Sequence, residues 1–143
     1  MTDNNIKIEI RNSHFVRLDT VTDSRGDLSF GEVGRNLPFE IKRVFWTYNI
    51  NERAERCNHA HRREWEVIFP IGGAWTIDMD DGQRKQTFRM DDPSVGLLIP
   101  PLVWCRLYDF EKGACCLCLA SNEYQPEDYI HSYEEFIRLT DVK

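Results

Sequence analysis

The chain has 143 residues, enough for one domain that buries a core without disulfide bonds or structural metals. Its formal net charge of −6, from 18 basic and 24 acidic residues, argues against binding to a nucleic-acid backbone, which requires a basic face. The first residues lack the basic and apolar regions of a secretory signal, and the apolar runs are too short to cross a bilayer. We therefore expect a cytoplasmic protein without nucleic-acid or membrane partners, folded as one domain over residues 1–143.

The first third of the chain contains short segments in which apolar residues occupy every second position. They lie at residues 6–10, 16–21 and 28–33, and a turn cluster at residues 23–27 separates the last two. Residues 39–48 alternate again and are rich in β-branched and aromatic side chains. We expect each of these segments to form a strand.

The middle of the chain is its most informative part. His59 and His61 are separated by one residue, so on a strand both imidazoles would point to the same face. Glu66 follows them, and the glycine pair Gly72–Gly73 ends the apolar run Val67–Ile71, as expected of a strand that enters a tight turn. This pattern predicts a pair of polar side chains that face one cavity.

The second half continues with predicted strands and ends with a predicted helix. An Asp-Gly turn at residues 80–82 joins strands over 74–79 and 83–90. Further strands are predicted on both sides of a proline turn in residues 95–110, and again over 114–120. In residues 126–139 the apolar side chains recur at helical spacing, and Pro126 lies in the first turn. Many short strands and one amphipathic C-terminal helix predict an all-β barrel or sandwich.

The five cysteines are an odd number, which argues against a disulfide framework. Cys115, Cys116 and Cys118 crowd one apolar segment without the Cys-x-x-Cys spacing of a zinc site, and on a strand Cys115 would face away from the other two. We expect these three thiols to be reduced and in the core. The isolated histidines His14 and His131 are expected at the surface.

The pair formed by His59 and His61 supports two chemistries. Two histidines on one strand face fit an apolar core poorly, because each buried ring needs hydrogen-bond partners, so we favour a functional pair. With Glu66 and Cys105 the pair could bind a metal, since imidazole, carboxylate and thiolate are ligands for zinc or iron-group ions. Without a metal it could act as acid and base, since histidine titrates near neutral pH. Cys105 could equally be a small buried hydrophobe.

These motifs resemble those of the cupin superfamily, whose members are small antiparallel β-barrels with inward histidines that hold a metal or act as acids and bases. The order His-x-His, then Glu66, then glycine is similar to the first cupin motif. Residues 95–105 match the second motif in outline. In many cupins a histidine stands where Cys105 stands here.

Further phrases resemble one narrower family, the sugar 3,4-ketoisomerases that act on thymidine-diphosphate-4-keto-6-deoxyglucose, together with the related WxcM-like domains. The resemblance covers about residues 21–136 in one register, which is far more specific than a lone His-x-His. The phrases are Asp23-Ser24-Arg25-Gly26, Pro38-Phe39-x-Ile41-Lys42-Arg43-Val44, Arg56-x-x-His59-Ala60-His61, Asp80-Asp81-Gly82, Pro93-x-Val95-Gly96-Leu97, Pro101-x-Val103-Trp104, Asp109-Phe110, Leu119-Ala120-Ser121-x-x-Tyr124 and Asp128-Tyr129-Ile130.

The resemblance implies an RmlC-like cupin barrel or jelly roll that forms a homodimer, with the N-terminal strand region of residues 1–20 exchanged between subunits. It implies an isomerase without cofactor or metal in deoxysugar biosynthesis for lipopolysaccharide or O-antigen, acting on a dTDP-linked 4-keto-6-deoxy sugar. His59 would be the carbon base and His61 would handle the hydroxyl proton, although the reverse order remains open. The implied substrate-binding residues are Arg25, Arg43, Arg56, Glu66, Trp104 and Cys105.

Three departures from the family pattern stand out, and the first, Cys57 and Asn58 after Arg56, carries little weight. Glu66 stands where a glutamine is usual and restores the carboxylate of metal-binding cupins. Cys105 stands where members often have histidine or arginine, at a position next to the sugar that influences the face on which C4 is protonated. Two alternatives therefore stay open, a metal-dependent cupin enzyme using His59, His61, Glu66 and Cys105, and a non-catalytic module that binds a nucleotide sugar.

Overall fold

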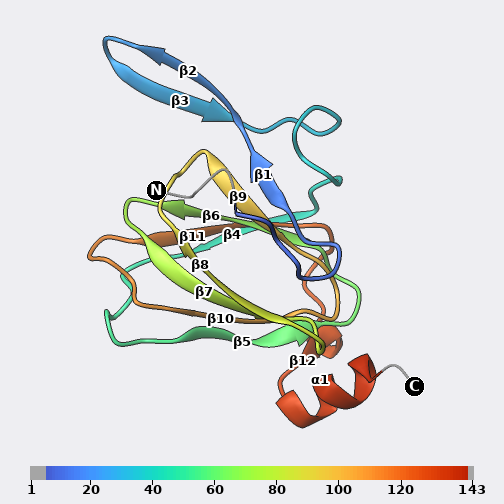
Figure 1. Ribbon diagram of the computed structural model, residues 1–143. Coiled ribbons are helices and arrows are strands. Elements are labelled where there is room, and N and C mark those ends of the chain that lie inside the picture. Colours follow the sequence, from blue (N-terminus) through green and yellow to red (C-terminus); the bar gives the residue numbers. More distant parts are fainter. Residues whose placement is uncertain (1–5, 142–143) are drawn as a thin grey trace.

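The computed structural model describes residues 6–141, which form two facing antiparallel sheets and a C-terminal helix (Figure 1). One sheet has the strand order β1-β9-β6-β11-β4 and the other β12-β5-β10-β7-β8, while β2 and β3 form a separate hairpin. The prediction of an all-β fold with one C-terminal helix is confirmed.

The strands are β1 (Phe15–Arg17), β2 (Asp19–Asp23), β3 (Gly26–Phe30), β4 (Arg43–Thr47), β5 (Arg56–His61), β6 (Glu66–Ile71), β7 (Trp75–Asp80), β8 (Lys85–Met90), β9 (Val95–Ile99), β10 (Trp104–Tyr108), β11 (Cys115–Ala120) and β12 (Tyr129–Ile130). The helical elements are the 3₁₀ turn η1 (Pro126–Asp128) and α1 (Tyr133–Thr140). Neither is long and apolar enough to span a bilayer, and no other helix was found in residues 6–141.

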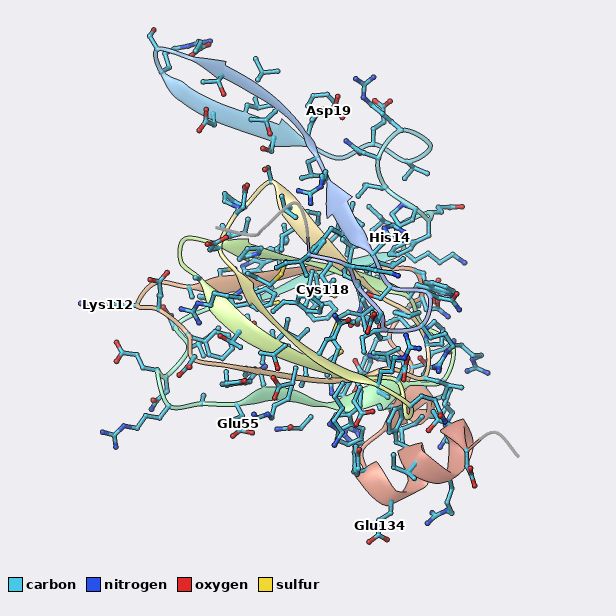
Figure 2. The ribbon with its side chains drawn as sticks, viewed as in Figure 1. His14, Asp19, Glu55, Lys112, Cys118 and Glu134 are labelled. Carbon is cyan, nitrogen blue, oxygen red and sulfur yellow. The ribbon has the colours of Figure 1, made fainter. Side chains whose placement is uncertain are left out.

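The core lies between the two sheets, where alternate side chains of the strands point inward. On β7, Trp75, Ile77 and Met79 are fully buried, and Leu97 of β9 and Leu107 of β10 pack in the same cluster. Burying a large apolar side chain contributes about 1.5–3 kcal/mol, so this cluster is a main source of stability. On β11 the predicted alternation holds, and Cys118 lies between the sheets (Figure 2).

The predicted strand at residues 6–10 is wrong, because these residues form no strand ladder. They run beside β8 and are held by a side chain. The amide of Gln86 donates to the Lys7 carbonyl at 3.0 Å and accepts from the Glu9 backbone N–H at 2.7 Å. Ile10 ends the segment in the core. Residues 1–5 of the predicted exchanged region lie outside the described residues.

The predicted helix over residues 126–139 begins later in the structure. Pro126 opens a 3₁₀ turn, and then Tyr129 and Ile130 extend and pair with His61 and Ala60 of β5. The helix begins after Ser132, whose hydroxyl accepts from the Glu135 N–H. Pairing with β5 therefore overrides the helical periodicity of the first half of this segment, and it brings the C-terminal segment to the histidines.

Candidate active site

A cavity of about 240 Å³ lies between the sheets and holds one of the two central histidines. Its polar wall comes from Arg56 and His59 of β5, Glu66 of β6 and Tyr129 of β12. The rest of its lining is Phe45, Thr47, Cys57, Ile68, Leu107, Cys116 and Cys118. A small, largely apolar cavity with a few converging polar groups is typical of a small-molecule site.

A β-bulge in β5 sets the direction of His59. Cys57 and Asn58 both have left-handed backbone angles, with φ of 70° and 55°. The register between β5 and β10 shifts there, so that Cys105 pairs with His59 while Arg106 pairs with Cys57. Such bulges re-aim side chains and are common beside active sites.

His59 is held in the form that can act as a base. Its Nδ1 lies 3.1 Å from the Cys57 carbonyl oxygen, which can only accept, so Nδ1 carries the proton and Nε2 keeps a lone pair. Burial, together with the neighbouring His61, lowers the pKa of His59 to about 4. His59 is therefore neutral at neutral pH.

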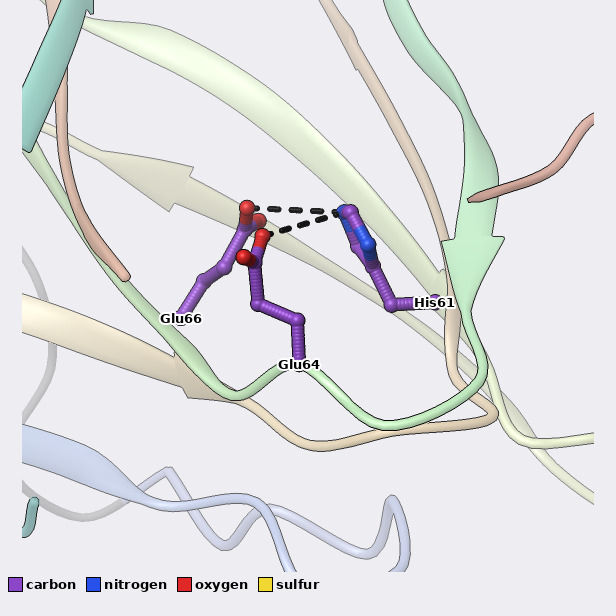
Figure 3. A group of neighbouring side chains, drawn as sticks. All are labelled: His61, Glu64 and Glu66. Atoms are coloured by element: carbon purple, nitrogen blue, oxygen red, sulfur yellow. Dashed lines mark ion pairs between the residues drawn. The ribbon is translucent and has the colours of Figure 1, made fainter. Parts of the chain in front are cut away.

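His61 is not part of the cavity lining, and its ring faces the carboxyl groups of Glu64 and Glu66 (Figure 3). The two imidazole centroids are 5.1 Å apart, and His61 is 4% exposed. Its Nδ1 is 3.1 Å from an Asp128 carboxylate oxygen, while its Nε2 is 3.5 Å from Glu64 and 3.4 Å from Glu66. Both ring nitrogens therefore face carboxyl groups.

Asp128 fixes the loop that follows β5 and was not predicted as a site residue. Its carboxylate accepts from the backbone N–H groups of Arg63 at 2.8 Å and Glu64 at 3.1 Å, besides its bond with His61. Asp128 comes from η1, far along the chain, so strand periodicity gave no sign of it. Its place in the phrase Asp128-Tyr129-Ile130 was the signal that could have found it.

Arg43 balances part of the negative charge around His61. Its guanidinium binds both oxygens of Glu64, at 2.9 and 3.1 Å, and also donates to the Asn122 carbonyl. Glu66 has no such cation at bonding distance among the described residues, and burial together with a hydrogen bond to Glu64 raises its pKa well above the usual value. Arg43, predicted to bind substrate, is thus not part of the cavity lining and pairs with Glu64.

The structure does not bring the remaining predicted site residues together. Arg56 lines the cavity, as noted above, and Cys105 is buried in the core between the sheets. Trp104 lies in a separate hollow on the outside of the second sheet, against Tyr133 of α1. Arg25 is at the tip of the β2–β3 hairpin, which projects away from the barrel, where it pairs with Asp23 (Figure 1).

Aromatic rings extend the wall around His59. Tyr129 lies 5.1 Å from His59 and 4.4 Å from His61, measured between ring centroids. His131 is exposed, as predicted, but it stacks on Tyr129 and its ring lies 6.1 Å from that of His59. A third histidine therefore stands near the site.

The arrangement does not fit a metal. Within residues 6–141 the group whose ligand atoms lie within 4.8 Å of one another is His61, Glu64 and Glu66, rather than the expected set that contained His59 and Cys105. Both oxygens of Glu64 are bound by Arg43. A guanidinium there supplies the positive charge that the carboxylates need and would repel an added cation.

Comparisons with known proteins agree with this geometry. Residues 11–141 match the family model described as FdtA: WxcM-like, C-terminal. The chain is 35% identical over 121 residues to TDP-4-oxo-6-deoxy-alpha-D-glucose-3,4-oxoisomerase of Aneurinibacillus thermoaerophilus, an alignment that covers 85% of this chain and 87% of that protein.

The chain is also similar to solved structures of 3,4-ketoisomerases. A variant of the 3,4-ketoisomerase QdtA from Thermoanaerobacterium thermosaccharolyticum, in complex with TDP-4-keto-6-deoxyglucose, has a TM-score of 0.89 at 30% identity and covers 92% of this chain and 95% of its own. The TDP-quinovose 3,4-ketoisomerase WlaRB of Campylobacter jejuni has a TM-score of 0.86 at 33% identity, covering 90% and 99%.

A more distant likeness identifies the fold. The rmlC epimerase of Mycobacterium tuberculosis has a TM-score of 0.74 at 13% identity, covering 86% of this chain and 70% of that one. This confirms the predicted RmlC-like cupin architecture. With the family match over residues 11–141 and the 35% identical relative, the chain belongs to the FdtA family of WxcM-like, C-terminal domains.

Proposed function

We propose that this protein converts a dTDP-linked 4-keto-6-deoxyhexose into the 3-keto isomer, in the synthesis of a deoxysugar. It is an enzyme of the 3,4-ketoisomerase type, as its relatives are. The observation that carries the proposal is His59, a half-buried neutral imidazole on the wall of a small cavity, with its unprotonated nitrogen free to accept a proton. We place the enzyme in the cytoplasm, with its five cysteines reduced, and its product in the route to a surface polysaccharide.

The reaction moves two protons and no other atoms. His59 takes the proton from C3 while O4 gains a proton, which gives an enediol. The proton on His59 exchanges with water at this stage; O3 then releases its proton and His59 delivers one to C4. The carbonyl has thereby moved from C4 to C3. Arg56 on the same cavity wall suits an anionic partner, the enediolate oxygen or the diphosphate. His61 stays our prediction for the group that serves the hydroxyl proton.

We also propose that the protein works as a homodimer in which the N-terminal strand region of residues 1–20, and with it the β2–β3 hairpin that follows, is exchanged between subunits. Two surfaces support this. The outside of the first sheet has an apolar hollow of about 470 Å³, whose lining includes Leu37, Phe69 and Leu117. The edge strand β4 exposes Val44 and Trp46, which are 49% and 57% accessible. Exposed edges and large apolar patches are typical of surfaces that a partner covers. In such a dimer the partner's hairpin would carry Arg25 toward the cavity.

The proposed function is tested by replacing the base. We expect His59→Asn to abolish turnover of TDP-4-keto-6-deoxyglucose, followed by NMR, while thermal unfolding and binding of TDP stay close to those of the unchanged protein. His14→Asn is the matched control, because His14 is exposed and its Nδ1 also bonds a carbonyl, that of Phe15, at 3.0 Å. Full activity in His59→Asn would reject the assignment of the base.

A further inference from the structure

Glu66 lies between the cavity and His61. It is 6% exposed, lines the cavity, and places Oε2 3.4 Å from His61 Nε2 (Figure 3). That nitrogen is the buried side-chain atom without a hydrogen-bond partner among residues 6–141. An unpaired polar atom at such a depth is unfavourable, so a proton shared by the two groups would stabilise the folded state.

The partners of His61 decide where its own proton lies. Asp128 is a carboxylate that accepts two backbone N–H groups, so it accepts from His61 Nδ1 as well. In a neutral imidazole with a proton on Nδ1, Nε2 is an acceptor that faces Glu64 and Glu66. A lone pair against two carboxylates would be repulsive. One of these carboxyl groups must therefore carry a proton, or His61 must be doubly protonated.

Arg43 decides between the two carboxyl groups. It binds both oxygens of Glu64, the two-point contact that a guanidinium makes with a carboxylate, and leaves Glu66 without a guanidinium of its own. Burial and the neighbouring Glu64 raise the pKa of Glu66, and burial lowers that of His61, so the single proton rests on Glu66. Glu64 is within reach of Glu66, but both Glu64 oxygens already accept from Arg43, whereas His61 Nε2 has no partner, so the proton of Glu66 is directed to His61.

We propose that Glu66 is a neutral carboxylic acid that donates a hydrogen bond to His61 Nε2, and that this bond is required to hold His61 in its neutral, Nδ1-protonated form beside the cavity. Glu66 is then a positioning residue for the isomerase. Its role in the reaction rests on the proposed function, whereas its protonation state does not.

The pH dependence of the rate can report the ionisation of Glu66 only if the groups around it do not titrate in the same range. These groups are Arg43 of β4, Arg56, Cys57, His59 and His61 of β5, Glu64 of the loop, Cys105 of β10, Cys116 and Cys118 of β11 and Tyr129 of β12. Burial raises the pKa of Tyr129 to about 12 and that of the Cys118 thiol well above its usual value. Neither group titrates at moderately alkaline pH. The exposed thiol of Cys57 also lines the cavity, so comparison with Glu66→Gln assigns a loss of rate there to Glu66.

The first test needs no substrate. In the full-length protein at neutral pH we expect an infrared carbonyl band of a protonated carboxylic acid that disappears in Glu66→Gln, and nitrogen NMR shifts of a neutral His61 protonated on Nδ1. An imidazolium at position 61, or no band that depends on Glu66, would overturn the proposal. This outcome would leave the isomerase itself untouched.

The second test uses turnover. We expect Glu66→Leu, which removes the donor, to lower kcat on the order of 100-fold, and Glu66→Gln, whose amide can donate the same bond, to recover most of this loss. The alkaline decline of the rate should be present in the unchanged protein and absent in Glu66→Gln. If Glu66→Gln is as slow as Glu66→Leu, or keeps the decline, the proposal is wrong. If the unchanged protein turns over no substrate, the proposed function fails, and the spectroscopic result still decides the state of Glu66.

Discussion

His59 and His61 are two positions apart on one strand and yet have different surroundings. His59 bonds a carbonyl and presents its free nitrogen on the cavity wall, whereas His61 is enclosed by carboxyl groups. The His-x-His spacing alone could predict that both side chains share a face. It could not predict the difference, because Glu64 and Asp128 approach from a loop and from the C-terminal segment.

The pH dependence of the reaction should reflect the lowered pKa of His59. Because His59 is neutral above a pKa of about 4 rather than 6.5, we expect kcat/KM to hold as the pH falls from neutrality and to decline only near pH 4. The folded state binds fewer protons than the unfolded state between these values. The stability contribution of His59 is therefore complete above the unfolded pKa and is lost as the pH falls through the folded pKa. A rate profile with an acid midpoint near 6.5 would contradict this assignment.

Replacing Asp128 should reduce stability and activity more than replacing its neighbours in sequence. Asp128→Asn places an amide next to donors, His61 and two backbone N–H groups, so we expect a loss of about 1–3 kcal/mol in the free energy of unfolding and a lower kcat. Glu127→Gln, an exposed change one residue away, is the control. Urea unfolding and steady-state kinetics check both. Equal behaviour of the two variants would show that the contact with His61 carries no weight.

At the scale of elements, the feature that prepares the site is the bulge in β5. Strand alternation predicted the segment but could not reveal two consecutive left-handed residues, because neither Cys57 nor Asn58 is a glycine. The bulge lets the Cys57 carbonyl meet His59 Nδ1. The local backbone strain is thus placed next to the proposed base.

This bulge leads to a prediction for Asn58. Asparagine tolerates left-handed angles, whereas a β-branched side chain does not, so Asn58→Val should cost roughly 1–3 kcal/mol and lower kcat by displacing His59. Asn58→Gly should keep both close to their original values. Thermal unfolding and steady-state kinetics of the valine and glycine variants check this prediction. A valine variant as stable and active as the glycine variant would mean that the bulge has no such role.

The sequence predicted most strands and missed two segments for physical reasons. A continuous apolar run gave β6, which is buried on both faces, and turn signals and alternation gave β7 and β8. Residues 6–10 also alternate, yet the side chain of Gln86 replaces the expected backbone pairing. Tyr129 and Ile130 have helical spacing, but their backbone pairs with β5. In both segments tertiary contacts, which no local pattern contains, decided the outcome.

At the scale of the whole molecule, the exposed edge of β4 and the projecting hairpin predict a dimer. We expect light scattering after gel filtration to give twice the mass of the chain, and Val44→Glu to shift the protein toward monomer by placing a charge on the exposed edge. Leu139→Glu is the control, because Leu139 is similarly exposed on α1, away from this edge. A monomeric unchanged protein would rule out the dimer.

The dimer also predicts that Arg25 acts in the partner's cavity. Arg25 lies at the hairpin tip. Within residues 6–141 of its own chain its ion-pair partner is Asp23 of the same hairpin, and no residue of the cavity contacts it. Arg25→Ala and His59→Asn should each be inactive alone. Co-expressed as mixed dimers they should regain activity, since one cavity then holds both original residues. Mixed dimers without activity would place Arg25 outside the reaction.

The central claim is that His59 removes the proton from C3 and delivers a proton to C4 without a metal. Its most direct test is proton NMR of the purified protein with fresh TDP-4-keto-6-deoxyglucose in heavy water, with and without a chelator. We expect a 3-keto product with deuterium at C4, formed at the same rate in both samples, and its coupling constants will give the configuration at C4. No exchange and no new ketone, or a rate abolished by the chelator, would contradict the account.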